Sequence, residues 1–230
     1  MTNMEYSFEE TPKDETPPLE IAKEEGERTK ITENVLRIAR EIDANNQLNG
    51  LDLVEEVCTY VRTMVPGKTT LELFKKQNPK AVFDKRTRSA DDLLSPDNLI
   101  PGHSRVRNID GCTEFAHITR ALLLAKGIPC VITDTLQEEW LRDKSKGWTL
   151  EGDNNNPVSG HNFVDVYIAE KGKWYTINPG NRDERVHEYG DYSIGDKRYV
   201  NPIRGKDSAD IGFPTMKEYL KALETALKTF

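Results

Sequence analysis

The segment 108–129 places the strongest constraint on how this chain can fold. Asp110 is a suitable helix N-cap residue, Gly127 suits a left-handed C-cap, and Pro129 prevents the helix from continuing. Between these ends, apolar residues cover almost the whole helix circumference: Phe115, Ala116, Ile118, Ala121, Leu122, Leu123, Leu124 and Ala125. A helix that is apolar on all sides is normally enclosed by other elements. The segment therefore predicts a core helix of which only the N-terminal end reaches a surface.

Cys112 lies in the first turn of this predicted helix. The N-terminus of a helix carries unpaired backbone N–H groups and a partial positive charge, and both favour a thiolate over a thiol. The same N–H groups can hold the oxyanion that forms when a nucleophile attacks a carbonyl group. The alternative is a structural cysteine, because cysteine is among the residue types most often buried. The position of Cys112 alone leaves both interpretations open.

Composition limits the class of protein. A length of 230 residues fits one domain, or one domain with an extension, and a net charge of −7 without a basic stripe predicts no nucleic-acid partner. No apolar run approaches the roughly 18 residues of a membrane span, and the first thirty residues lack the apolar core of a signal peptide. Three cysteines without CxxC spacing favour free thiols in a reducing cytoplasm over disulfides or a zinc site. We therefore expect a cytoplasmic protein with no metal and no cofactor.

The first 28 residues are rich in acidic residues and proline, so they offer little apolar surface to offset the entropy of ordering. We predict that residues 1–28 are a flexible or loosely docked acidic arm and that residues 29–230 form one domain. A plain tail is one interpretation of the arm, and a propeptide-like or partner-docking segment is another.

The remaining patterns predict helices around the central helix and strands after it. Helical spacing of apolar residues, or a helix-start signal, occurs at 31–42, 52–64, 69–77, from Ser89 onward and at 215–227, and capping boxes are predicted at Asp52 with Glu55 and at Thr215 with Glu218. β-Branched and aromatic residues predict a strand at 130–135, a β-hairpin from strands 161–168 and 174–178, and short strands within 183–213.

Residues 136–160 form a turn-rich stretch that contains Trp140 and Trp148. One interpretation is a surface excursion whose two tryptophans pack on the body of the protein. The other is a lid or substrate rim, because the stretch leads directly into His161 and loops on a rigid scaffold often carry specificity.

A thiol nucleophile needs a base, and the base needs an orienting partner. The chain has four histidines. His117 lies within the central helix, about 140° around its axis from Cys112, and His103 and His187 lie in irregular segments. His161 begins a predicted strand directly after the turn-rich stretch. His161 is therefore the candidate base.

The predicted hairpin supplies Asn178 as a candidate orienting group. Side chains alternate between the faces of a strand, so a two-residue turn at 171–172 puts Asn178 on the same face as His161. That register sets Asn178 opposite Asp165, roughly 13 Å along the strand from His161. A hydrogen bond between His161 and Asn178 then requires a different register, a bulge or strong twist.

Three segments of the chain together resemble the transglutaminase-like superfamily: Gly111-Cys112 followed by Ala-Leu-Leu-Leu-Ala-Lys-Gly-Ile-Pro, then Gly160-His161-Asn-Phe-Val-Asp-Val-Tyr, then Lys173-Trp174-Tyr-Thr-Ile-Asn178-Pro179. The resemblance covers roughly residues 50–182. It implies an α+β fold with a papain-like core, in which a central cysteine-bearing helix packs on an antiparallel β-sheet. The predicted N-terminal helices and the C-terminal helix complete this architecture.

The resemblance also implies roles for individual residues. Cys112 matches the nucleophile and His161 the general base, whereas Asn178 stands where the superfamily usually has an aspartate and papain-like peptidases have an asparagine. Asp165 matches an acidic position of the histidine strand, to which we assign a structural role. The chain lacks the paired CxxC zinc site of peptide N-glycanases and acidic calcium loops like those of animal transglutaminases.

These observations predict a cysteine-type acyl-transfer enzyme that acts on amide bonds of a peptide or protein. The simplest form is a hydrolase, a peptidase or amidase that uses a catalytic triad of Cys112, His161 and Asn178. One alternative is a transglutaminase-type transfer to an amine. The other is a non-catalytic module that keeps the fold and binds a peptide in its groove. The sequence does not indicate an oligomeric state.

Overall fold

The computed structural model describes residues 16–44, 47–81, 84–142, 160–180 and 186–229. Within these ranges the α-helices are α1 (Leu19–Lys23), α2 (Glu33–Glu41), α3 (Gly50–Thr63), α4 (Lys68–Gln77), α5 (Ala90–Leu94), α6 (Cys112–Ala125), α7 (Glu138–Arg142) and α8 (Met216–Thr229). Short 3-10 helices are η1 (Pro79–Ala81), η2 (Pro96–Asn98) and η4 (Ala169–Lys171). The strands are β1 (Cys130–Gln137), β2 (Gly160–Ile168), β3 (Lys173–Ile177), β4 (Val186–Glu188), β5 (Ser193–Ile194) and β6 (Lys197–Gly205).

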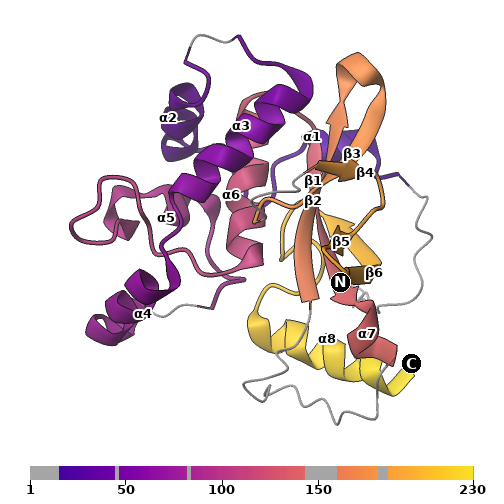
Figure 1. Ribbon diagram of the computed structural model, residues 1–230. Coiled ribbons are helices and arrows are strands. Elements are labelled where there is room, and N and C mark those ends of the chain that lie inside the picture. The colour runs from indigo at the N-terminus through magenta and orange to yellow at the C-terminus, as the bar shows by residue number, and fades with distance from the viewer. Residues whose placement is uncertain (1–15, 45–46, 82–83, 143–159, 181–185, 230) are drawn as a thin grey trace.

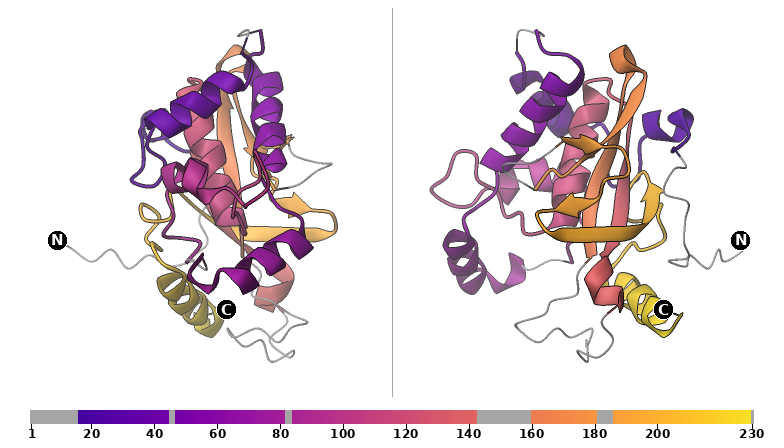
Figure 2. Two further views of the ribbon diagram at one scale, coloured as in Figure 1. Left: turned by 90° about the vertical axis from the view of Figure 1, so that its left-hand side faces the viewer. Right: turned by 45° about the vertical axis from the view of Figure 1, so that its right-hand side comes forward.

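The strands described form one six-stranded sheet in the order β4-β3-β2-β1-β6-β5, and every adjacent pair is antiparallel. Helix α6 lies between this sheet and helices α2, α3 and α5 (Figure 1). Helix α1 lies on the opposite side of the sheet, as the right-hand view of Figure 2 shows. The predicted α+β fold, with a cysteine-bearing helix packed on an antiparallel sheet, is confirmed.

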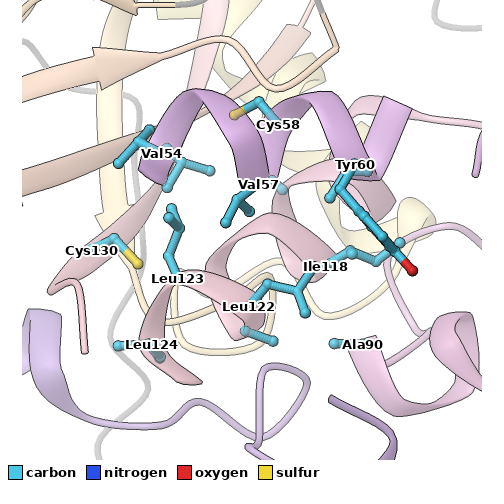
Figure 3. Close-up of a cluster of buried hydrophobic side chains, with 14 of the residues drawn as sticks. Val54, Val57, Cys58, Tyr60, Ala90, Ile118, Leu122, Leu123, Leu124 and Cys130 are labelled. Atoms are coloured by element: carbon cyan, nitrogen blue, oxygen red, sulfur yellow. The ribbon is translucent and has the colours of Figure 1, made fainter. Parts of the chain in front are cut away.

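The central helix is buried along almost its entire length. Residues 113–124 are all buried, whereas Cys112 is half-buried. Val54 and Val57 of α3 belong to the same buried hydrophobic cluster as Ile118 and Leu122 of α6, and all four side chains are excluded from solvent (Figure 3). Removing a buried leucine such as Leu122 from a core of this kind costs about 2–5 kcal/mol. The prediction of an enclosed helix is confirmed. The prediction that its N-terminal end alone reaches the surface is wrong, because Ala125 at the C-terminal end is half-buried and Gly127 after it is exposed.

The ends of α6 differ in how well the sequence predicted them. Gly127 has φ of +78°, and the N–H of Ile128 donates to the Leu123 carbonyl at 2.9 Å, so the predicted glycine C-cap is present. The predicted Asp110 N-cap is wrong, because the N-cap residue is Gly111. The Asp110 carboxylate instead pairs with two lysines, Lys75 and Lys85.

The two predicted capping boxes also have different outcomes. Thr215 and Glu218 exchange hydrogen bonds at the start of α8, with the Glu218 N–H donating to Thr215 Oγ1 at 3.2 Å, so this box is confirmed. The box at Asp52 is wrong, because α3 begins two residues earlier, after the N-cap residue Asn49. Asp52 therefore lies in the first turn of α3, where its negative charge interacts favourably with the positive end of the helix dipole.

A second apolar cluster joins α8 and α7 to the sheet end nearest the start of β2 (Figure 1). Its buried members are Leu136, Trp140, Leu141, Val200, Ile211, Phe213, Tyr219 and Leu223. Trp140 thus packs on the body of the protein. Trp148 and the rest of the expected surface excursion or lid, residues 143–159, lie outside the described residues.

The acidic N-terminal segment does not behave as one flexible arm through residue 28. Ala22 of α1 is buried, the Arg28 N–H donates to Asp207 Oδ2 at 2.7 Å, and Arg120 of the central helix donates to the Glu24 carbonyl at 2.6 Å. These partners are 96 to 179 residues away in sequence, so local composition does not reveal them. Residues 16–28 are therefore attached to the domain, and residues 1–15 lie outside the described residues.

The expectation of short strands within 183–213 is right for β4 and β5 and wrong for β6. Strand β6 has nine residues and pairs with β1 in the interior of the sheet. Its sequence contains Lys197, Arg198 and Arg204, whose charged side chains obscure the alternation expected of a strand.

Candidate active site

Helix α6 and strand β2 begin at the same end of the sheet (Figure 1). Cys112 is the first residue of α6, and Gly160 and His161 are the first residues of β2. As whole residues, Cys112 and His161 are both half-buried, whereas their neighbours Thr113 and Asn162 are buried. The two elements therefore bring a thiol and an imidazole together at the end of the sheet.

The hairpin between β2 and β3 places Asn178 differently from the sequence prediction. The two strands close at the pair Ile168–Lys173, so the connection contains four residues, ending at Gly172 with φ of +61°. The predicted two-residue turn is wrong, and Asp165 lies opposite Thr176 rather than Asn178. A four-residue connection preserves the parity of a two-residue turn, so Asn178 remains on the face of His161.

This register brings His161 and Asn178 into contact. Asn178 directly follows Ile177, which pairs with Val164, and it therefore lies closer along the sheet to His161 than predicted. The His161 Nε2–H donates to Asn178 Oδ1 at 3.0 Å. Asn178 is buried, with 1% of its surface exposed. The hydrogen bond holds the ring and leaves Nδ1 as the nitrogen available to the sulfur.

The electrostatics of the pair favour charge on both groups. Burial by itself raises the pKa of Cys112, but the hydrogen bond and charge interaction with His161 and the N–H of Asn162 lower it, so the pKa lies below its ordinary value. Burial by itself lowers the pKa of His161, but Cys112 and the hydrogen bond to Asn178 raise it, so the pKa lies above its ordinary value. The two shifts together favour a thiolate beside an imidazolium.

Three further polar residues lie behind Cys112, and sequence reasoning missed all three. Asn162 Oδ1 accepts from the Cys112 thiol at 3.4 Å, and Asn162 Nδ2 donates to Asp134. Asp134 pairs with Arg86. A signal was present for one of them, because Asp134 interrupts an otherwise apolar face of its strand beside Cys130 and Ile132.

Aromatic side chains surround the other side of the imidazole. The His161 ring centroid lies 4.8 Å from that of Phe163 and 5.6 Å from that of Tyr199 on β6. Burial and the negative charge of Cys112 raise the pKa of Tyr199. Tyr199 is therefore close to both members of the pair, and sequence reasoning missed it because the position of β6 was not predicted.

The other histidines have different surroundings. His117 is completely buried, its Nδ1 hydrogen-bonds the Arg88 carbonyl at 2.9 Å, and burial lowers its pKa to about 4. His103 lies in an exposed loop, and His187 lies on β4, 3.8 Å from Asp191. The sequence argument that favoured His161 over these three therefore agrees with the geometry.

Asp165 lies away from the thiol, within the buried face of β2. Its carboxylate accepts hydrogen bonds from four side chains: Thr133 at 2.7 Å, Thr176 at 2.7 Å, Tyr192 at 2.8 Å and Arg204 at 3.2 Å. These donors come from β1, β3, the segment before β5, and β6. Asp165 thus links four parts of the fold, in accord with the structural role assigned to it.

The other two cysteines differ sharply from Cys112. Cys58 and Cys130 are completely buried in the core, and burial raises the pKa of Cys130 to about 12. Within the described residues, no group of three or more histidines, cysteines or carboxylates is arranged to hold a metal ion. No helix in the described ranges is long and apolar enough to cross a membrane.

No protein-family model matches the chain, and no curated protein sequence matches it. A solved structure that resembles it is that of a protein from Cytophaga hutchinsonii, provisionally assigned as a cysteine protease, with 15% sequence identity and a TM-score of 0.49. The alignment covers 90% of this chain and 54% of the other, so this chain spans about half the length of that protein.

Proposed function

We propose that the chain is a cysteine-dependent enzyme that hydrolyses amide bonds of a peptide or protein. Cys112 is the nucleophile, His161 the general acid and base, and Asn178 the residue that orients the imidazole. The proposal rests mainly on one observation, which is that the imidazole beside the Cys112 thiol is held from its far nitrogen by Asn178 at 3.0 Å. The order of the three segments, which resembles that of the transglutaminase-like superfamily, also supports it.

The reaction has two stages. The Cys112 thiol gives its proton to His161, and the thiolate attacks the substrate carbonyl carbon, with the oxyanion held by backbone N–H groups at the start of α6. The imidazolium protonates the leaving amine, and a thioester remains on Cys112. Neutral His161 then takes a proton from water, the hydroxide attacks the thioester, and the acid leaves as the thiol re-forms.

The asparagine at 178 shapes this mechanism. Its carbonyl oxygen accepts from the imidazole N–H and fixes the ring orientation, but it adds no negative charge to stabilise an imidazolium. The imidazolium is therefore stabilised mainly by the charge of the neighbouring thiolate, and the thiolate in turn is stabilised by the N-terminal end of α6. Water is the acyl acceptor in this proposal because hydrolysis needs no binding site for a second substrate, and nothing in the sequence identifies an amine site.

Selective alkylation tests the assignment of the nucleophile. The folded protein is treated with iodoacetamide near pH 7, digested and examined by mass spectrometry. We expect modification of Cys112, with Cys58 and Cys130 modified only after unfolding, because both are completely buried. The variants C58A and C130A are the matched controls and should react like the wild type. Labelling of Cys58 or Cys130 with Cys112 spared would contradict the proposal.

Trapping the acyl-enzyme tests the activity itself. Mixed peptide p-nitrophenyl esters are added, and the intact protein is measured by mass spectrometry shortly afterwards. We expect an acyl adduct that hydroxylamine removes and that is absent from C112A, with much slower formation in H161A. Peptide binding without any adduct would indicate a binding module. Stable amide products formed with added methylamine, with no free acid, would indicate transfer to amines.

A further inference from the structure

The three polar side chains behind the thiol form one buried network, which we call the Asn162 network: Asn162, Asp134 and Arg86. Their exposed fractions are 2%, 1% and 1%. Asn162 and Asp134 are directly opposite each other in the register of β2 and β1. The sheet itself therefore fixes two members of the network, and neither the proposed chemistry nor the core packing accounts for them.

The Asn162 network determines which atom of Asn162 faces the sulfur. The Asp134 carboxylate is held by Arg86 and can only accept hydrogen bonds, so the Asn162 amide must turn its Nδ2 toward it. Oδ1 then points the other way, where it accepts from Thr113 Oγ1 at 2.8 Å and from the Cys112 thiol at 3.4 Å. Rotating the amide to offer an N–H to the sulfur would leave a buried carboxylate without that donor.

Arg86 anchors the far end of the Asn162 network to the C-terminal part of the chain. Its Nε donates to the Phe213 carbonyl at 2.7 Å, and its guanidinium lies 4.4 Å from the Tyr219 ring centroid. Tyr219 belongs to α8. The Asn162 amide is thus held through Asp134 and Arg86 by contacts with the C-terminal part of the chain, and these contacts fix its orientation.

We propose that Asn162 is a positioning residue whose carbonyl, oriented by Asp134 and Arg86, anchors the Cys112 thiol and opposes its ionisation. This inference deepens the proposed function and rests on it. A carbonyl oxygen stabilises an S–H group but repels a thiolate, whereas the His161 ring favours the thiolate. His161 and the backbone N–H of Asn162 favour the thiolate, whereas the side-chain carbonyl of Asn162 opposes it and raises the pH at which the thiolate forms.

Other ionisable groups also surround the sulfur, from every element packed on it. They are His161 on β2, Asp134 on β1, Arg86 before α5, Tyr199 on β6 and Tyr219 on α8. Asp134 and Arg86 oppose each other in their effect on the thiolate. A variant at Asn162 changes no formal charge among these groups, so its effect on the titration of Cys112 reports the amide itself.

The test measures the alkylation rate of Cys112 against pH in the free protein, with mass spectrometry to assign the site. In N162A we expect the midpoint of the profile to fall by about half to one pH unit, the equivalent of one lost hydrogen bond, which is a roughly three- to tenfold faster reaction on the acid side. The control is T113V, which removes the other donor to Oδ1 but keeps the carbonyl, and its midpoint should not fall. A role confined to folding would lower the unfolding temperature and leave the midpoint unchanged.

A second variant guards against a failure of N162A to fold. In N162S the short hydroxyl side chain can still donate to Asp134, but it has no carbonyl for the sulfur, so the midpoint should also fall. An unchanged or higher midpoint in the folded variants overturns the inference. Because this measurement needs no substrate, amide hydrolysis without the shift refutes only the role of Asn162. The shift without any acyl-enzyme refutes only the proposed function.

Discussion

Replacing Asn178 by aspartate tests how the imidazole of His161 is held. The variant keeps the shape of the side chain and puts a carboxylate oxygen where Oδ1 now lies, 3.0 Å from His161 Nε2. An opposite charge at this range typically shifts a pKa by about 1–3 units, or about 1.4–4 kcal/mol in favour of the imidazolium. We expect the lower part of this range, because Asn178 is 1% exposed and burial of a carboxylate opposes its ionisation.

The midpoint of His161 protonation is measured by NMR from its ring Cε1 proton, assigned with H161Q. It should lie about one unit higher in N178D than in the wild type. In N178A it should lie lower, because the hydrogen bond to Asn178 raises the pKa of His161. The raised pKa of His161 in the folded state stabilises the protein at low pH, and this stabilisation is lost as pH rises through that pKa. N178D should therefore keep the stabilisation up to a higher pH than the wild type. The same midpoint in all three proteins would refute the reasoning.

Three other predictions concern stability. Burial holds the pKa of His117 at about 4 in the folded state, so as pH drops the unfolded chain binds the proton first, and the free energy of unfolding falls by up to about 3 kcal/mol between about pH 6.5 and pH 4. In H117Q, urea unfolding at a series of pH values should no longer show this fall. An unchanged dependence on pH would mean that other groups cause it. G160A should lower the free energy of unfolding by about 1–3 kcal/mol, because a Cβ at this position would lie 1.6 Å from Tyr219 Oη. Adding Y219F to G160A should recover part of this loss, and strictly additive effects of the two substitutions would argue against the contact. D165A should lower the free energy of unfolding by about 3–5 kcal/mol, because it leaves the Arg204 guanidinium without its buried partner. A midpoint of thermal unfolding close to that of the wild type would exclude this structural role of Asp165.

The candidate site could be predicted as far as its parts depend on local pattern. Helical periodicity marked the central helix, and strand composition marked the two arms of the hairpin, so Cys112 and His161 were candidates before any spatial information. Parity placed Asn178 on the correct face even though the turn was wrong, because connections of two and four residues leave the same side chains facing the same way. The register was not predictable, since it depends on how a 3-10 turn at 169–171 closes the hairpin.

The missed residues have partners that lie far away in sequence. Asp110 was expected to cap its own helix, but Lys75, 35 residues away, takes its carboxylate. Arg86 contributes to the site through Asp134, 48 residues away, and no local periodicity identifies such a pair. The attachment of residues 16–28 to the domain has the same origin.

The sequence by itself determined the central helix, most of the helices around it and the two strands of the hairpin, and with them the positions of Cys112 and His161. Periodicity and capping act within a few residues, so they are visible without coordinates. The tertiary structure alone decided the register, the position of β6 and the Asn162 network. These features depend on the free energy of contacts between segments that are distant in sequence, and local patterns carry no information about such contacts.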